Sequence, residues 1–352
     1  METKLLEEIL SNFANKQVAV LGDFFLDLYI HLDRTLSEFS LETNKEAFQA
    51  TEIYGQPGAA GVVTNNIVAL GAKASAIGYI GQDGYGYNLI NALSNEGVDT
   101  TFLLESKERY TPTYTKPIMK EVDGVFNELN RIDIVNRTPN PPGLNDLLVD
   151  HLKQAFNSHD GILVLEQLQN DGCGVMSPLL RTALNQLTQQ FPEKVVLVDS
   201  RHHVTAYRNV SIKTNLSEAI RTLDKNIDKP NHNDIDNKIN IASNCLKTLW
   251  DLNHKPGFIT LGEDGIRGID QNETFYYPGF VQDGPIDIVG AGDSVLAGIG
   301  LALCSGATPK QAAYIGNLVG SIIVQKIGTT GVATPDEILQ QHQAYQNQCK
   351  GN

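Results

Sequence analysis

Short apolar runs alternate along most of the chain with longer segments whose apolar residues recur at helical spacing. The short runs are typical of buried strands, and the longer segments of helices that pack one face against a sheet. This alternation predicts an α/β fold, with a mostly parallel sheet and helices on both of its faces. The expected strands are Val18–Gly22, Ala74–Ile80, Gly161–Glu166, Lys194–Asp199, Gly257–Gly262 and 275–278, and the expected helices are 2–14, 60–70, 87–95, 144–157, 177–190, 238–251, 293–305, 309–326 and 335–347.

Two regions depart from this alternation. Between about 100 and 135, Thr, Tyr, Phe, Ile and Val dominate and polar residues alternate with them. We expect antiparallel strands outside the main sheet here, joined by part of 30–57. The polar residues 221–240 predict an exposed loop and the start of a helix. Since we find no internal repeat and no long linker, we expect residues 1–352 to form one domain with a small β appendage.

The net charge narrows the classes of partner. The chain has 352 residues and a formal net charge of −14. An acidic surface repels nucleic acid and anionic lipid, so we expect neither as a partner, whereas a local Lys and Arg cluster can still bind an anionic small molecule. The first residues lack a long apolar core and no C-x-x-C pair occurs, which favours a cytoplasmic protein. The four scattered cysteines are Cys173, Cys245, Cys304 and Cys349.

The strongest chemical signal is the segment Asp287–Gly298, in which Gly290, Ala291 and Gly292 precede an apolar helix that begins at Asp293. The two glycines let several backbone N–H groups point the same way, and the helix N-terminus adds partial positive charge. Such a cradle suits a developing phosphate anion, and Asp293 can accept the proton of an attacking hydroxyl. The alternative is that Asp293 only caps the helix.

Two further groups of polar residues follow expected strands. Lys213 can neutralise phosphate charge, and Asn215 with Glu218 can hold a hydrated Mg²⁺. The alternative is an ordinary capping box formed by Asn215 and Glu218. Asp23 and Asp27 follow the first buried strand, and carboxylates suit sugar hydroxyls, although Asp23 alone can be a turn former.

These motifs resemble the ribokinase-like (PfkB) family of carbohydrate kinases. Residues 287–293 are similar to the family's D-T-x-G-A-G-D signature, with Ile288 in place of Thr, and residues 57–71 to its N-terminal glycine-rich signature. Residues 215–218 match the family's N-x-x-E motif. The resemblance covers nearly the whole chain. It implies a three-layer α/β/α sandwich with a β-sheet lid from 30–57 and 100–135, and phosphoryl transfer from ATP to a sugar-like hydroxyl.

The resemblance also implies roles for individual residues. Asp293 is the base, and Gly290, Ala291 and Gly292 form the anion hole. Asn215 and Glu218 organise the hydrated Mg²⁺. A monovalent cation such as K⁺ is implied at loop carbonyls near Asp287 and after Ile323, and a homodimer is implied through the lid. The residues implied along ATP are Lys213, Asn215, Glu218, Thr260, Gly262, Gly265, Asn317 and the turn 328–331.

On the acceptor side, the motifs look closest to the heptose-7-phosphate kinase branch. The acceptor would contact Asp23, Asp27, Gly58 and Ala59, and Lys116 and Arg131 would meet the phosphate already on the sugar. Three departures from the family, at Ala59, Val62 and Glu166, suggest that the acceptor itself differs. The alternatives are a nucleoside kinase of the same fold and a nucleotide-binding regulatory protein. The sequence disfavours a Rossmann dehydrogenase, because no G-x-G-x-x-G follows the first strand.

Overall fold

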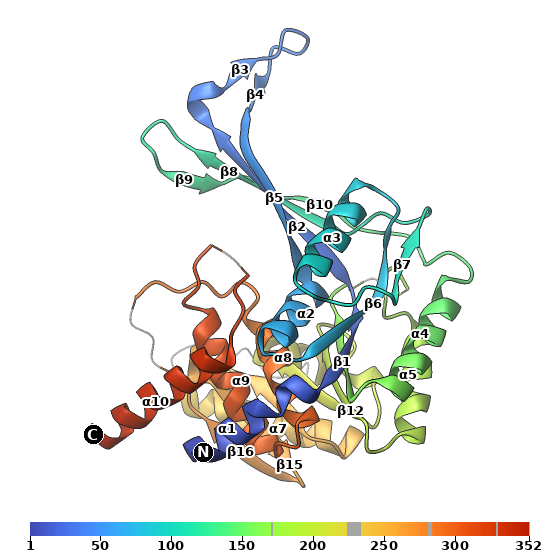
Figure 1. The fold of residues 1–352 in the computed structure, drawn as a ribbon, viewed down its shortest axis with the longest axis vertical. Coiled ribbons are helices and arrows are strands. Elements are labelled where there is room, and N and C mark those ends of the chain that lie inside the picture. Colours follow the sequence, from blue (N-terminus) through green and yellow to red (C-terminus); the bar gives the residue numbers. More distant parts are fainter. Residues whose placement is uncertain (170–171, 224–233, 281–283, 329, 352) are drawn as a thin grey trace.

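The computed structural model describes residues 1–169, 172–223, 234–280, 284–328 and 330–351. Within these ranges a nine-stranded sheet has the order β16-β15-β14-β13-β12-β11-β1-β6-β7 (Figure 1). The strands from β14 to β7 in this order run parallel, and β15 and β16 extend the sheet as antiparallel strands. The strands are β1 (Gln17–Gly22), β6 (Lys73–Gly81), β7 (Leu103–Ser106), β11 (Gly161–Glu166), β12 (Val195–Ser200), β13 (Ser211–Asn215), β14 (Gly257–Thr260), β15 (Ile266–Asp270) and β16 (Glu273–Tyr277).

Helices cover both faces of this sheet because its central strands are apolar on both sides. Along β11, Leu163 and Leu165 pack into one buried cluster, and Ile162 and Val164 into the other. The predicted three-layer arrangement is confirmed. One layer contains α1 (Thr3–Ser11), α2 (Ala60–Ala69), α3 (Gly84–Asn95), α8 (Ala291–Cys304), α9 (Pro309–Ile323) and α10 (Pro335–Gly351), and the other contains α4 (Leu144–Ser158), α5 (Pro178–Gln190), α6 (Leu216–Leu223) and α7 (Ile235–Asn253).

A second sheet projects from the body (Figure 1). Its strand order is β10-β8-β2-β5, and β9 pairs with β8. A short hairpin of β3 and β4 lies at its far end. The strands are β2 (Phe24–Asp33), β3 (Glu38–Phe39), β4 (Glu46–Ala47), β5 (Ala50–Ala59), β8 (Thr113–Lys120), β9 (Phe126–Glu128) and β10 (Ile132–Ile134).

The second sheet has a polar and an apolar face because its residues alternate. The strand registers align Asp27 with Gln56 and Tyr114, and the neighbouring Lys116 shares their side. We call these four residues the polar face. The opposite side, which we call the apolar face, carries Ile30, Ile53, Ile132 and Ile134.

The structure corrects two details of the expected appendage. Residues 103–106 form β7, which lies at the edge of the main sheet and runs parallel to β6. Strands β2 and β8 are parallel, so the second sheet is mixed and not purely antiparallel. Alternation along a strand shows which positions are buried, but it carries no information about strand direction or about the sheet that a strand joins. Residues 224–233, within the expected polar loop, lie outside the described residues.

Ala59 has an unusual backbone conformation for an alanine. Its φ is 51° and its ψ is −117°, and it lies where β5 ends and α2 begins. This region of backbone space is open to glycine but strained for a residue with a Cβ. Its partner in the β2–β5 ladder is Phe24, next to Asp23, so the strain lies close to an expected acceptor residue.

We therefore expect Ala59→Gly to raise the free energy of unfolding by about 1 kcal/mol, since relief of strain outweighs the greater freedom of glycine in the unfolded chain. Urea unfolding measures the change. The matched control is Ala183→Gly within α5, where the same replacement should lower stability by about 1 kcal/mol. A loss of stability at both positions would contradict a strained Ala59.

Candidate active site

The residues around Asp293 come from the carboxyl edge of the main sheet and from the start of α8. Gly290 caps α8 with a left-handed φ of 75°, so that Ala291, Gly292 and Asp293 form the first helical turn. The N–H groups of a first turn have no partners within the helix and can face an anion. Residues 290–292 therefore lie at a helix N-terminus, as the sequence predicts.

Lys213 on β13 lies beside this turn and pairs with Asp199 on β12. Their Nζ and Oδ2 atoms are 2.5 Å apart, and both side chains are buried. A Cβ on Gly292 would lie 3.3 Å from Nζ of Lys213, so Gly292 leaves room for the ammonium. Burial lowers the pKa of Lys213. The negative charge of Asp199, together with those of Asp293 and Glu218, outweighs burial, so the lysine pKa is raised. Lys213 thus places a fixed positive charge next to Asp293.

Asp293 is partly buried, and burial raises its pKa to about 7. The charge of Lys213 opposes this rise, and that of Asp199 adds to it. Arg201 and Asp27 also act on the carboxylate, so the base candidate lies within reach of both the main sheet and the polar face. A carboxylate with a pKa near neutrality is suited to accept a proton.

Asn215 and Glu218 form the capping box that was the alternative to an Mg²⁺ role. Asn215 Oδ1 accepts from the Glu218 N–H at 2.9 Å, and Glu218 Oε2 accepts from the Asn215 N–H at 3.2 Å. Burial, followed by the charge of Asp199, raises the pKa of Glu218. Oε1 of Glu218 has no hydrogen bond among the described residues, so it can still meet a water of hydrated Mg²⁺. The two roles are compatible.

The residues implied along the nucleotide form a row next to this box. Thr260 is the register partner of Asn215 on the neighbouring strand. Gly262 and Gly265, with φ values of 66° and 97°, shape the turn that follows Thr260. Asn317 on α9 donates to the carbonyl of Pro278 at 2.7 Å, which satisfies its nearly buried amide.

Asp287 connects two loops near the start of α8. Its N–H donates to the carbonyl of Val324 at 2.8 Å, and its carboxylate accepts from the N–H groups of Val289 at 3.0 Å and Gly328 at 3.0 Å. The segment before α8 and the turn after α9 therefore lie together. Loop carbonyls there belong to the region expected to hold a monovalent cation.

Asp23, expected to contact the acceptor, is occupied by the protein itself. Its buried carboxylate accepts backbone N–H groups of Gln167 at 3.1 Å, Leu168 at 3.2 Å and Val175 at 2.8 Å. Burial raises its pKa to about 6, and these hydrogen bonds partly counter that rise. Asp23 therefore holds the chain that follows β11 against the end of β1.

Asp27 and Lys116 form the centre of the polar face. Lys116 Nζ donates to Asp27 Oδ2 at 3.0 Å and to the hydroxyl of Tyr29 at 3.1 Å. A Cβ on Gly58 would lie 2.9 Å from Asp27 Oδ1, so this glycine allows the carboxylate its position. Arg131 makes a bidentate pair with Asp133, at 2.6 and 2.7 Å. Both expected phosphate-binding cations are thus already paired.

Glu166 is a correction to the expected acceptor site. It is buried and accepts hydrogen bonds from Arg181 at 2.5 Å, Ser200 at 2.5 Å and Tyr207 at 2.8 Å. Its departure from the family pattern therefore concerns a buried network that supports the ends of β11 and β12. A sequence cannot distinguish this case from a substrate contact, because in both a carboxylate follows a strand.

Two residues that sequence reasoning missed, Asp199 and Gln56, also belong to this region. Asp199 pairs with Lys213, and Thr330 donates to Gln56 on the polar face at 3.2 Å. The side chain of Thr330 lies near Gly290, as does that of Val62. The sequence could have pointed to Asp199, because it is a charged residue at the end of an apolar run. Nothing in the sequence pairs Gln56 with Thr330.

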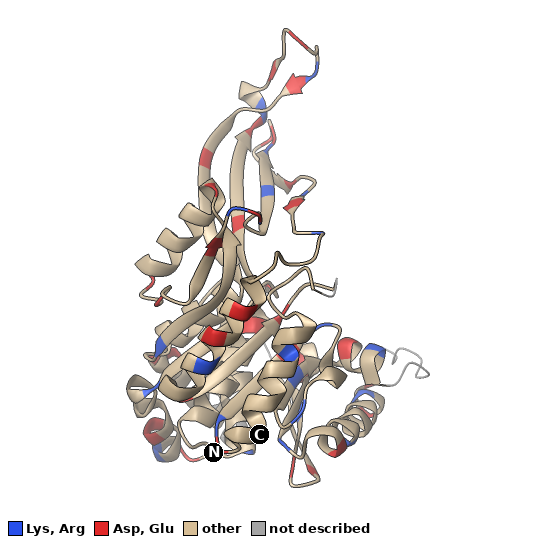
Figure 2. Cartoon of the chain, turned by 90° about the vertical axis from the view of Figure 1, so that its right-hand side faces the viewer, with Lys and Arg blue, Asp and Glu red and all other residues tan. Residues whose placement is uncertain are grey.

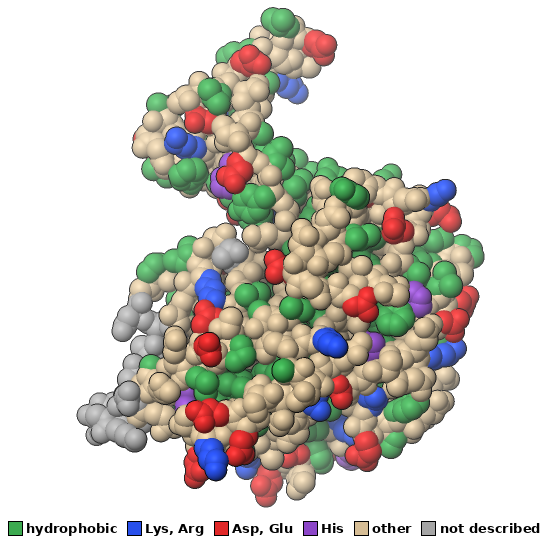
Figure 3. Space-filling model, viewed as in Figure 1, with side chains coloured by type: hydrophobic (Ala, Val, Ile, Leu, Met, Phe, Trp, Pro, Cys, Tyr) green, Lys and Arg blue, Asp and Glu red, His purple; other side chains and the backbone are tan. Residues whose placement is uncertain are grey.

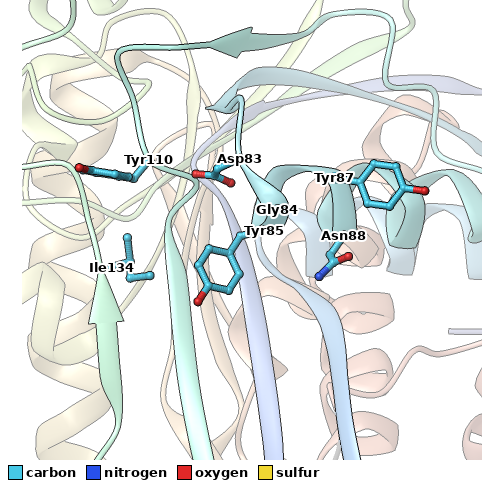
Figure 4. A pocket seen from close by; sticks show the side chains of 7 residues that line it. All are labelled: Asp83, Gly84, Tyr85, Tyr87, Asn88, Tyr110 and Ile134. Carbon is cyan, nitrogen blue, oxygen red and sulfur yellow. The ribbon is translucent and has the colours of Figure 1, made fainter.

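The surface has two features relevant to ligands. Figure 3 shows a deep hollow between the projecting second sheet and the body. In Figure 2, the Lys and Arg positions are spread over the body and the second sheet and form no single band. An apolar cavity of about 740 Å³ lies elsewhere (Figure 4), and none of the candidate residues lines it. Its lining residues are Asp83, Gly84, Tyr85, Tyr87, Asn88, Tyr110 and Ile134.

Comparisons with known proteins find relatives of this chain. The model of the "pfkB family carbohydrate kinase" matches residues 15–336. A "Bifunctional protein HldE" from Geobacter metallireducens is 28% identical over 348 residues, which are 96% of this chain and 65% of that protein. A second one, from Koribacter versatilis, is 30% identical over 333 residues, which are 93% of this chain and 63% of that protein. The chain thus spans less than two-thirds of the length of both relatives.

Solved structures show the same fold. The phosphofructokinase-2 of Escherichia coli in complex with potassium superposes with a TM-score of 0.68 at 17% identity, covering 94% of this chain and 98% of that one. The ribokinase of Arabidopsis thaliana complexed with ribose and ATP gives a TM-score of 0.66 at 16% identity, covering 93% of this chain and 98% of that one.

The fold and the family match together define the class of protein. The chain belongs to the pfkB family of carbohydrate kinases, so the predicted resemblance is confirmed. Its fold is the ribokinase-like α/β fold.

The raised pKa of Asp293 predicts a pH-dependent cost to stability. Because the folded state favours the neutral acid, the wild type loses this stabilisation as the pH rises from 3.8, the ordinary pKa of an aspartic acid, through about 7, its pKa in the folded state. The free energy of unfolding of Asp293→Asn, relative to that of the wild type, should therefore rise by about 1 to 2 kcal/mol between pH 5 and pH 8.5. This is less than the whole pKa change would give, because Asp293 still contacts solvent. Chemical unfolding at both pH values measures this, and a difference independent of pH would contradict it.

Proposed function

We propose that this protein is a sugar kinase that transfers the γ-phosphoryl group of ATP to a hydroxyl of a sugar phosphate, with a heptose 7-phosphate as the first candidate and Asp293 as the base. The observation that carries the catalytic part is the position of Asp293, in the first turn of α8, beside the Lys213–Asp199 pair and with a pKa raised to about 7. The sequence motifs and the two HldE relatives support the choice of acceptor.

In the proposed mechanism, ATP lies along the row from Lys213 to Thr260 and the adjacent glycine turn. Bound Mg²⁺ would neutralise phosphate charge, held through water by Asn215 and Glu218. The ammonium of Lys213 and the N–H groups of residues 290–292 face the moving phosphoryl group. Asp293 accepts the hydroxyl proton of the acceptor. A monovalent cation near Asp287 is part of this proposal.

The acceptor is proposed to lie between Asp293 and the polar face of the second sheet. Asp27 is the carboxylate of that face whose charge acts on Asp293. The contact between Thr330 and Gln56 joins the second sheet to the turn near Gly290, which supports a lid that covers the site. Such a lid would exclude water, which otherwise competes with the sugar for the phosphoryl group.

We also propose that the protein is a homodimer joined through its second sheets. The apolar face exposes Ile53 and Ile132, each 62% accessible, and the hairpin beyond it exposes Phe39 at 70%. The apolar cavity continues this face, because Ile134 of the apolar face lines it together with Tyr87 (Figure 4). An exposed apolar sheet face that extends away from the body is best covered by a second copy of itself.

We expect Asp293→Asn to bind ATP with unchanged affinity and to lose about 10²- to 10⁴-fold in kcat, because the hydroxyl proton then has no acceptor. Steady-state kinetics and ATP titration calorimetry measure the two effects. Lys247→Ala on α7, which removes an exposed charge elsewhere, is the control. A variant with near wild-type kcat would show that Asp293 only caps α8.

The acceptor class is tested by ATP consumption against sugars, sugar phosphates and nucleosides, with Asp293→Asn as the blank. We expect turnover with heptose 7-phosphate and little with the unphosphorylated sugar. Turnover only with nucleosides would contradict the sugar phosphate as acceptor and would support the alternative of a nucleoside kinase. A panel without turnover, combined with retained ATP binding, would support the regulatory alternative.

The dimer predicts that a charge on the apolar face separates the two copies. Ile53→Asp and Ile132→Asp should each shift the mass measured by light scattering from that of a dimer to that of a monomer. Leu147→Asp on α4 is the control, since Leu147 is 51% accessible but lies outside the second sheet. A wild type that is monomeric at working concentration would refute the proposed dimer.

A further inference from the structure

Arg201 is a charged residue near Asp293 to which neither the family signatures nor the sequence motifs assign a role. It follows β12 directly, and its N–H donates to the carbonyl of Glu166 at 3.3 Å. Gln167, the next residue after Glu166, has its side chain against the hydroxyl of Tyr114 on the polar face. The backbone therefore places Arg201 at the carboxyl edge of the main sheet, below the polar face.

The charge of Arg201 reaches both sides of the proposed acceptor space. It acts on the carboxylate of Asp293 and on the hydroxyl of Tyr114. Two residues earlier, Asp199 pairs with Lys213 on the side of the phosphoryl group. Arg201 therefore follows the end of β12 at the same edge of the sheet as the Lys213–Asp199 pair.

The pairing of the neighbouring cations distinguishes Arg201 from them. Lys116 already donates to Asp27 and Tyr29, and Arg131 already holds Asp133 with two hydrogen bonds. In the part of the chain that the structure describes, the guanidinium of Arg201 makes no hydrogen bond or ion pair, and the residue is exposed. Binding an anion with Lys116 or Arg131 would mean sharing an existing pair, whereas the guanidinium N–H donors of Arg201 have no partner among the described residues.

We propose that Arg201 determines acceptor specificity by binding the anionic phosphate that the sugar already carries. A guanidinium presents two parallel N–H donors that match two oxygens of a phosphate. A neutral sugar hydroxyl cannot take the place of the phosphate in this contact. The net charge of the protein is −14, so a free cation in this place is what makes a dianionic acceptor acceptable. This inference rests on the proposed function, because it assumes that the acceptor enters between Asp293 and the polar face.

The test compares Arg201→Ala, Arg201→Lys and the control Lys247→Ala with the wild type. Each enzyme is assayed with D-glycero-D-manno-heptose 7-phosphate and with the same heptose without phosphate. We expect Arg201→Ala to raise KM for the phosphorylated sugar about tenfold or more, with kcat changed less than about threefold. KM for the unphosphorylated sugar should remain as in the wild type. Arg201→Lys should fall between, because it keeps the charge but loses the fork.

Binding is measured in parallel by calorimetry, so that the test does not depend on turnover. Heptose 7-phosphate is titrated into Asp293→Asn and into the double variant with Arg201→Ala. We expect the double variant to bind about tenfold more weakly or worse. Thermal unfolding verifies that both proteins are folded.

The outcomes separate this inference from the proposed function. If the wild type turns over heptose 7-phosphate and Arg201→Ala has the same KM for it, the role of Arg201 is overturned. The kinase assignment then still stands. A fall in kcat with both sugars at constant KM would also overturn it, since Arg201 would then act on the moving phosphoryl group. Arg201-dependent binding of the sugar phosphate without turnover would support Arg201 and count against the proposed reaction. Failure of the wild type to bind any sugar phosphate would refute both.

Discussion

The buried pair of Lys213 and Asp199 is the interaction around which the rest of the site is arranged. Two neighbouring parallel strands end in opposite charges, and their 2.5 Å contact keeps the ammonium ionised despite its burial. A buried charge is tolerated only when it is compensated, so Asp199 is what allows Lys213 to lie against Gly292. The positive charge then partly counters the burial of Asp293, whose pKa of about 7 reflects this balance. A stronger pull from Lys213 would leave a weaker base.

The second sheet applies a different constraint, because its two faces serve different surroundings. The polar face carries Asp27, whose charge acts on Asp293, and Tyr114, on which the charge of Arg201 acts. The apolar face leaves Ile53 and Ile132 exposed. A single alternating pattern in β2, β5, β8 and β10 thus provides both the polar face proposed for the acceptor and the apolar face proposed for self-association. A shift of one residue in register would exchange the two faces, so both proposals depend on the same strand pairing.

Several carboxylates that look alike in the sequence have different environments in the structure. Asp23 and Glu166 are occupied by backbone N–H groups and by a buried network, respectively. Asp27 pairs with the side chain of Lys116, and Asp293 lies in the first turn of α8. The first two keep the ends of β1, β11 and β12 together, and so support the position of Arg201. Burial alone does not separate the two groups, and only the list of hydrogen-bond partners does.

The sequence by itself determined the layered α/β architecture, because periodicity reports which positions are buried, and it determined the α8 signature, because glycines before an apolar helix leave few other conformations. It also singled out Lys213, Asn215, Glu218 and Asp27 as candidate site residues. Tertiary structure alone decided that β7 joins the main sheet, that Asp23 and Glu166 are already hydrogen-bonded, and that the guanidinium of Arg201 has no partner among the residues that the structure describes. These features depend on contacts between residues far apart in the chain. Such contacts produce no periodic pattern in the sequence, because the type of a residue does not specify which distant residue it contacts after folding.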